Sequence, residues 1–136
     1  MYDLEKISII IDDVNMYLRK IEGMDLLSMK KIDDLYFDAC SMNCFSLLNK
    51  LVDLAEEIVR SKDMGTPFKM RDLFDMLASA KVINDKMAKE TGDMIILRNK
   101  FSHRYDIITE KELLRFIKDI YKIREFVKSI EQEVKK

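Results

Sequence analysis

Apolar residues recur at three- and four-residue steps along almost the whole chain, and this spacing restricts the possible folds more than any other feature. Such spacing places apolar side chains on one face of a helix. Turn-forming residues are few, because the 136-residue chain has only three Gly and one Pro. A fold of many short strands needs more of them. The sequence therefore predicts an all-α protein, an up-and-down helical bundle of roughly four to six helices in one domain that spans residues 1–136.

The segments that share this spacing are expected to be helices: about Leu4 to Glu22, Ile32 to Val59, Met70 to Leu77, Asp85 to His103, and Thr109 to Ile130. Gly23 is a natural stop for the first helix, and Asp63-Met64-Gly65-Thr66-Pro67 is the clearest turn signal. Thr109 and Glu112 have the spacing of a capping box, in which each side chain bonds the backbone N–H of the other.

The helix that approaches His103 has two further features. Four consecutive apolar residues, Met94 to Leu97, cover nearly all sides of a helix, so we expect protein to surround it. Gly92, with Ala88 one turn earlier, narrows one face and is expected to let another helix approach closely. That contact would offset the helix-destabilising effect of Gly, up to about 1 kcal/mol.

Charge and cysteine content exclude several classes of protein. The net charge is -1, from 24 basic and 25 acidic residues, so any contact with nucleic acid requires positive charge that is concentrated locally. Cys40 and Cys44 lack a second Cys/His pair that would complete a tetrahedral zinc site, and a disulfide across one helical turn is strained. We expect free, buried thiols in a reducing cytosol and no metal site.

The N-terminal sequence and the hydropathy pattern bear on location. Acidic residues precede and follow the first apolar run, which is unlike a signal peptide. No apolar run approaches the length that spans a bilayer. A cytoplasmic protein without membrane contact is therefore expected.

The only histidine, His103, lies among Arg98, Lys100 and Arg104. Asn99 is four residues before His103, so its amide can hold one ring nitrogen. Arg98 is about 140° around a helix from His103, and a straight helix does not bring the two side chains together. Either the helix loosens, or the arginine side chain wraps back, or the two groups come from two chains.

The third possibility matches a known chemistry. Metal-free RNA cleavage needs a base for the 2′-OH, an acid for the leaving 5′ oxygen and a cation for the phosphorane between them. A twofold dimer supplies a second histidine and a second arginine, and the usual histidine pKa of about 6.5 suits either proton transfer. The alternative is structural: His103 caps carbonyl groups, the cations form a solvated patch, and Tyr105 is a half-buried ring with a solvated hydroxyl.

The spacing of Arg98, His103 and Tyr105 resembles the signature of the HepT toxins within the HEPN superfamily. The segment LRNKFSHRY is similar to that family's RN…HxY segment. The long second helix, the Gly-Thr-Pro turn, the short third helix and the helix at Thr109 also follow the family's order. The resemblance extends from about Asp33 onward.

This resemblance implies a HEPN bundle that forms a homodimer and acts as a metal-independent endoribonuclease toxin on RNA, without a cofactor. The implied partner is an MNT-type minimal nucleotidyltransferase antitoxin, which transfers AMP to the motif tyrosine, here Tyr105. Arg98 would hold the scissile phosphate, His103 would move protons and Asn99 would orient His103.

Lys100 and Arg104 are not part of the family motif. Their positive charge fits a surface by which RNA approaches, although Arg104 stands where the family commonly has an acidic residue. A second hypothesis is a non-enzymatic helical dimer that docks a nucleotidyltransferase through Tyr105 or through the face of Arg98 and His103.

Overall fold

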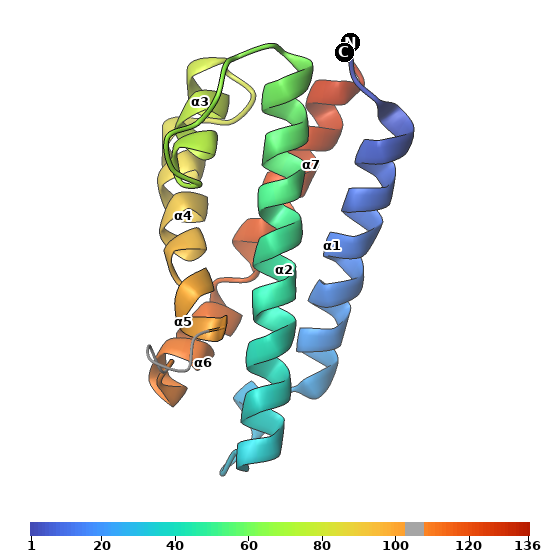
Figure 1. Ribbon diagram of the computed structural model, residues 1–136. Helices are drawn as coiled ribbons and strands as arrows, with labels where there is room; N and C mark the ends of the chain where they lie inside the picture. The colour runs from blue at the N-terminus through green and yellow to red at the C-terminus, as the bar shows by residue number, and fades with distance from the viewer. Residues whose placement is uncertain (103–107) are drawn as a thin grey trace.

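The structure is a computed structural model that describes residues 1–102 and 108–136. Within these residues the elements are seven α-helices and one 3₁₀ turn, with no strand: α1 (Leu4–Met24), η1 (Leu26–Ser28), α2 (Asp34–Ser61), α3 (Asp72–Ser79), α4 (Asp85–Ile96), α5 (Arg98–Ser102), α6 (Glu110–Lys118) and α7 (Tyr121–Val134). In Figure 1, α1 and α2 run antiparallel, α4 and α5 descend, and α6 and α7 return to the end where both termini lie. The predicted all-α bundle is confirmed.

Two of the predicted helices are each divided. α4 ends at Ile96 and α5 begins at Arg98, because the N–H of Leu97 bonds the carbonyl of Met94 at 3.1 Å, a tighter turn than in an α-helix. The last helix is interrupted between Lys118 and Tyr121. The expectation of one continuous helix in each stretch was wrong. Taking each divided pair as one rod restores the predicted order of helices.

The first helix ends later than predicted. α1 continues through Gly23 to Met24, and Asp25 adopts a left-handed conformation with φ 52°. The N–H of Asp25 then bonds the carbonyl of Glu22 at 3.1 Å. A short polar side chain tolerates this conformation, so the helix does not need its glycine as the stop.

The other two predicted helix boundaries, the turn after α2 and the capping box of α6, are confirmed. Asp63 and Gly65 both have positive φ, 53° and 93°, in the turn that follows α2. Thr109 and Glu112 form the expected capping box at the start of α6, with N···O distances of 3.1 and 3.0 Å.

The core lies where the apolar faces of the rods meet. Phe74 of α3 packs against Phe126 of α7, with ring centres 5.5 Å apart, and both rings are fully buried. Cys40 and Cys44 are also buried and free, as predicted, and burial raises the pKa of the Cys44 thiol. None of the helices in the described ranges is long and apolar enough to cross a membrane.

Gly92 accommodates a side chain rather than a helix. A Cβ at this position would lie 3.2 Å from Cγ of Arg71, the residue before α3. The Arg71 guanidinium continues to Asp93, with an Nη2···Oδ1 distance of 2.6 Å. The predicted close approach of another helix is therefore corrected: the missing Cβ leaves room for the stem of Arg71, which ties the start of α3 to α4.

The four apolar residues before Arg98 are only partly covered. Met94 and Ile95 are buried, but Ile96 is 57% exposed. The expectation that protein surrounds this helix on all sides thus fails at Ile96 within one copy of the chain.

Candidate functional site

Arg98, the first residue of α5, is held against the middle of α2. Its Nε–H donates a hydrogen bond to Oδ1 of Asn49, and its guanidinium carbon lies 5.2 Å from the centre of the Phe45 ring. Phe45 and Asn49 are four residues apart, so they occupy one face of α2. Nη1 of Arg98 also donates to Oδ1 of Asn99 across a long 3.4 Å. One helix face therefore orients the guanidinium.

Phe101 anchors α5 to the core. Its ring is 5% exposed and meets Phe116 of α6 edge to face, with centres 5.1 Å apart. Its backbone N–H bonds the carbonyl of Leu97 at 3.1 Å. With this ring buried, the half-buried Arg98 and the exposed Asn99 lie at the surface of the bundle.

Lys100 links α5 to α6. Its Nζ lies 2.7 Å from Oε2 of Glu112, while Oε1 of Glu112 accepts the N–H of Thr109 at 3.0 Å. The hydrogen bond from Lys100, and then that from the Thr109 backbone, lower the pKa of Glu112 to about 2. The positive charge of Lys100 is therefore shared with a carboxylate.

The predicted site residues fall in two groups. Arg98, Asn99 and Lys100 lie on α5. His103 and Tyr105, together with Arg104, lie outside the described residues. The orientation of His103 by Asn99, and the meeting of Arg98 with His103, therefore stay predictions.

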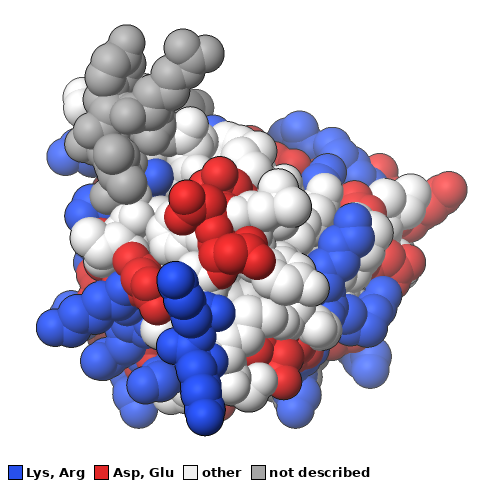
Figure 2. Space-filling model, turned by 90° about the horizontal axis from the view of Figure 1, so that it is seen from below, with Lys and Arg blue, Asp and Glu red and all other residues white. Residues whose placement is uncertain are grey.

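Charge near this site is local rather than spread over a face. Figure 2 shows the lower end of the bundle, with Lys and Arg gathered at the lower left and along the right side and Asp and Glu near the middle. This agrees with the net charge of -1. The basic side chains in this view are interrupted by acidic and uncharged ones and do not cover the whole end.

Sequence reasoning did not single out Asn49 and Phe45, and it assigned Glu112 only to the capping box. Asn49 and Phe45 hold Arg98, and Glu112 pairs with Lys100. The available signal for Asn49 was an amide within the apolar part of α2, since Leu47, Leu48, Leu51 and Val52 around it are all buried. Such a position is unusual for a polar side chain unless it has a partner.

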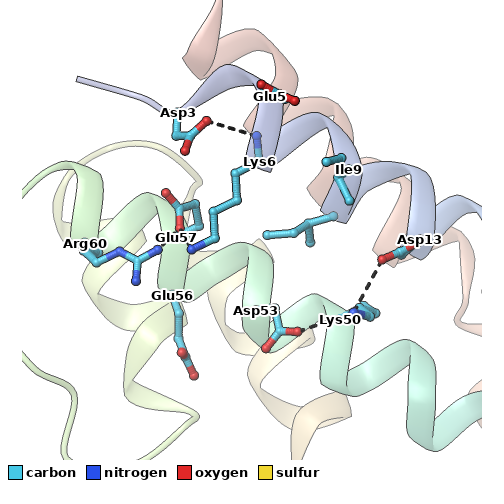
Figure 3. A pocket seen from close by; sticks show the side chains of 11 residues that line it. Asp3, Glu5, Lys6, Ile9, Asp13, Lys50, Asp53, Glu56, Glu57 and Arg60 are labelled. Carbon is cyan, nitrogen blue, oxygen red and sulfur yellow. Dashed lines mark hydrogen bonds and ion pairs between the residues drawn. The ribbon is translucent and has the colours of Figure 1, made fainter.

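A groove of about 480 Å³ lies elsewhere, between α1 and α2 (Figure 3). Glu57, 4% exposed, pairs with Arg60 of its own helix. Two ion pairs cross between the helices: Lys6 lies 3.0 Å from Glu57, and Lys50 lies 3.4 Å from Asp13. These pairs tie α1 to α2, which is a structural role. The described part of the chain contains no cluster of His, Cys, Asp and Glu suited to a metal ion.

Comparison with known proteins identifies the family. The family model described as Ribonuclease HepT-like matches residues 7–130. No curated protein sequence matches the chain.

Three solved structures illustrate the similarity of fold. A HEPN toxin of Shewanella oneidensis, tri-AMPylated and in complex with MNT antitoxin, has a TM-score of 0.86 at 22% identity, covering 97% of this chain and 99% of that one. A toxin–antitoxin crystallised with AMP-PNP gives 0.85 at 21%, covering 93% and 97%. YutE of Bacillus subtilis, a cytosolic protein of unknown function, gives 0.83 at 21%, covering 98% and 93%.

At these identities the solved structures establish the fold alone. The family model extends over nearly the whole chain, including the segment of Arg98, His103 and Tyr105 that resembles the HepT signature. The chain belongs to the Ribonuclease HepT-like family.

Proposed function

We propose that the chain is the toxin of a toxin–antitoxin pair and cuts RNA without a metal ion, at a site that contains Arg98 and His103. The observation that carries this proposal is the guanidinium of Arg98, held by α2 at the surface of a member of the Ribonuclease HepT-like family. Such a group is suited to a phosphate, because its planar donors match two phosphate oxygens.

The proposed reaction is an internal phosphoryl transfer. His103 takes the proton of the 2′-OH, whose oxygen attacks the adjacent phosphorus while the bond to the 5′ oxygen breaks. A second histidine, protonated, gives a proton to the leaving 5′ oxygen. The products carry a 2′,3′-cyclic phosphate and a 5′-hydroxyl. Arg98 stabilises the charge on the phosphorane, and Asn99 orients His103.

A homodimer would supply the second histidine, and an exposed apolar stripe on α2 supports it. Leu35, 81% exposed, and Met42, 54% exposed, are seven residues apart and share a face that continues to Asn49. Ile96, two residues before Arg98, is 57% exposed. A second copy that covers these side chains would bring two copies of the motif together.

The proposed regulator is an MNT-type nucleotidyltransferase, acting in the cytoplasm. The tyrosine oxygen of Tyr105 would attack the α-phosphorus of ATP, and pyrophosphate would leave. Each AMP adds bulk and negative charge close in sequence to Arg98 and His103, where RNA phosphate must bind. The tri-AMPylated HEPN toxin with a similar fold, in complex with MNT antitoxin, supports this partner.

The test is cleavage of single-stranded RNA by the purified chain in EDTA, with analysis of the product ends. We expect cyclic phosphate ends from the parent protein. His103→Ala should abolish cleavage while its circular dichroism spectrum and its Tm match those of the parent. If His103→Ala cuts as fast as the parent, the catalytic assignment is wrong.

The net charge of -1 and the pairing of Lys100 with Glu112 favour a second candidate, a non-enzymatic dimer that docks a nucleotidyltransferase. In that case RNA cleavage is absent under all conditions. Mass increments of whole AMP units on Tyr105, after co-expression with a nucleotidyltransferase partner, would then appear without any nuclease activity.

A further inference from the structure

We propose that Asn49 and Phe45 are positioning residues for Arg98: they fix its guanidinium in one orientation and leave its phosphate-binding edge open. The role in RNA binding rests on the proposed function. The orientation itself does not, and it can be measured without RNA.

The hydrogen bonds of Arg98 define which edge is open. A guanidinium has five N–H donors. Nε–H donates to Asn49, and Nη1 donates to Asn99 over 3.4 Å, while no described residue accepts from Nη2. Because the bond to Asn49 occupies the edge that contains Nε, the edge formed by Nη1 and Nη2 is the one available for two-point contact with a phosphate.

Phe45 constrains the same group in a second direction. The guanidinium carbon lies over its ring, 5.2 Å from the ring centre, within the range of a cation–π contact. Asn49 therefore holds the Nε–H, and Phe45 holds the guanidinium carbon. Both side chains come from one face of the long helix α2, so one rigid element sets both constraints before a ligand binds.

The chemical type of the anchor also matters. Four other arginines of the described chain are held by carboxylates: Arg60 by Glu57, Arg71 by Asp93, Arg115 by Asp119 and Arg124 by Glu22. Arg98 is held by a neutral amide. An amide accepts the Nε–H without cancelling the positive charge, so the full charge remains for a polyanion.

Asn49→Asp is the main variant, because it keeps the shape and the acceptor but adds a negative charge. We expect its affinity for a 2′-O-methylated single-stranded RNA, which cannot be cleaved, to fall about tenfold or more, the usual size of one lost contact to a charged group. The slope of log affinity against log salt should also decrease by roughly 0.7, the value for one phosphate contact on a single strand.

Asn43→Asp is the matched control. Asn43 lies on the same helix and directs Nδ2 to Sδ of Met24 at 3.8 Å, away from Arg98. It undergoes the same change in net charge, so its RNA affinity and salt slope should match those of the parent. Phe45→Leu is a second variant, in case Asn49→Asp fails to fold, and is expected to weaken RNA binding by a smaller factor.

Asn49→Leu separates orientation from charge. It removes the acceptor and adds no charge, so kcat for RNA cleavage should fall about tenfold while KM changes by less than about threefold. The direct readout is exchange of the Arg98 Nε–H with solvent, followed by ¹⁵N NMR. This exchange should be slow in the parent and in Asn49→Asp, and fast in Asn49→Leu.

The outcomes separate this inference from the proposed function. Fast exchange of the Arg98 Nε–H in the parent contradicts the hydrogen bond to Asn49, whether or not the protein binds RNA. If the parent cuts RNA and Asn49→Asp binds it with the parent's affinity and salt slope, the positioning role is overturned and the proposed function stands. If exchange is slow but the parent neither binds nor cuts RNA, the proposed function is wrong. Asn49 and Phe45 then still orient Arg98, but they have no role in RNA binding.

Discussion

The proposed role of Arg98 requires a guanidinium that is held in one orientation and keeps its positive charge. An amide and an aromatic ring restrict its guanidinium, and neither contributes a negative charge. A lysine has the same charge, but it has neither the Nε–H that donates to Asn49 nor the planar guanidinium that lies over Phe45. The shape of the side chain, and not only its charge, is therefore expected to matter at this position.

Arg98→Lys tests that expectation. The variant should cut RNA at least about tenfold more slowly than the parent, because it loses two-point phosphate contact and its own orientation. Initial rates in EDTA on one RNA substrate are the measurement. Lys128→Arg, at an exposed lysine of α7, serves as the comparison and should change the rate little. A rate for Arg98→Lys within twofold of the parent would show that charge alone suffices.

Two glycines in helices allow a test of the contact between Gly92 and Arg71. A Cβ at Gly23 would meet nothing within 4 Å, whereas one at Gly92 would lie 3.2 Å from Arg71 Cγ. Gly23→Ala should therefore raise the free energy of unfolding by about 1 kcal/mol, the usual difference in helix propensity. Gly92→Ala should raise it by less, because the Arg71 stem must shift. Urea denaturation of both variants measures this difference, and equal gains would contradict the contact.

At the scale of elements, the sequence predicted a helix cap formed by nearby residues, but it did not predict the break in a helix or the contacts between helices. The capping box at Thr109 and Glu112 involves residues three apart, so the sequence alone specifies it. The break at Leu97 lies within an unbroken apolar run, and no spacing rule marks it. The contacts of Arg98 with Asn49, and of Lys100 with Glu112, join different helices and depend on the fold.

The ion pair of Lys100 with Glu112, which links α5 to α6, is expected to weaken in acid. The pKa of Glu112 in the folded chain is about 2, below the usual 4.5, because Lys100 and the Thr109 N–H stabilise the carboxylate. A lowered pKa contributes stability above pH 4.5 that is lost as the pH falls toward 2.

The Tm difference between the parent and Glu112→Gln should therefore be largest above about pH 4.5 and should shrink as the pH falls toward 2. Thermal melts across this range are the measurement. Glu110→Gln, in the same helical turn, controls for the general effect of removing a carboxylate. A difference that stays constant with pH for Glu112→Gln would mean that neither Lys100 nor the Thr109 N–H stabilises the carboxylate.

For the whole molecule, the sequence predicted the bundle and the order of its rods, since apolar spacing persists along each rod. A single chain does not specify what covers Leu35 and Met42 of α2 and Ile96 of α4, which leave apolar area exposed on these two helices. With a net charge of -1, RNA affinity must come from a few placed groups. A second copy would double those groups, and we propose that two copies share the site that cuts RNA.

The most direct test is RNA cleavage in EDTA by mixed dimers, purified with two different tags, in which one subunit carries Arg98→Ala and the other carries His103→Ala. Each mixed dimer retains one arginine and one histidine. We expect a rate below that of the parent, because one histidine of the pair is missing, and above those of both mutant homodimers, because neither of these has both an arginine and a histidine. A mixed dimer no faster than either mutant homodimer, under conditions where the parent cuts RNA, would contradict a shared site.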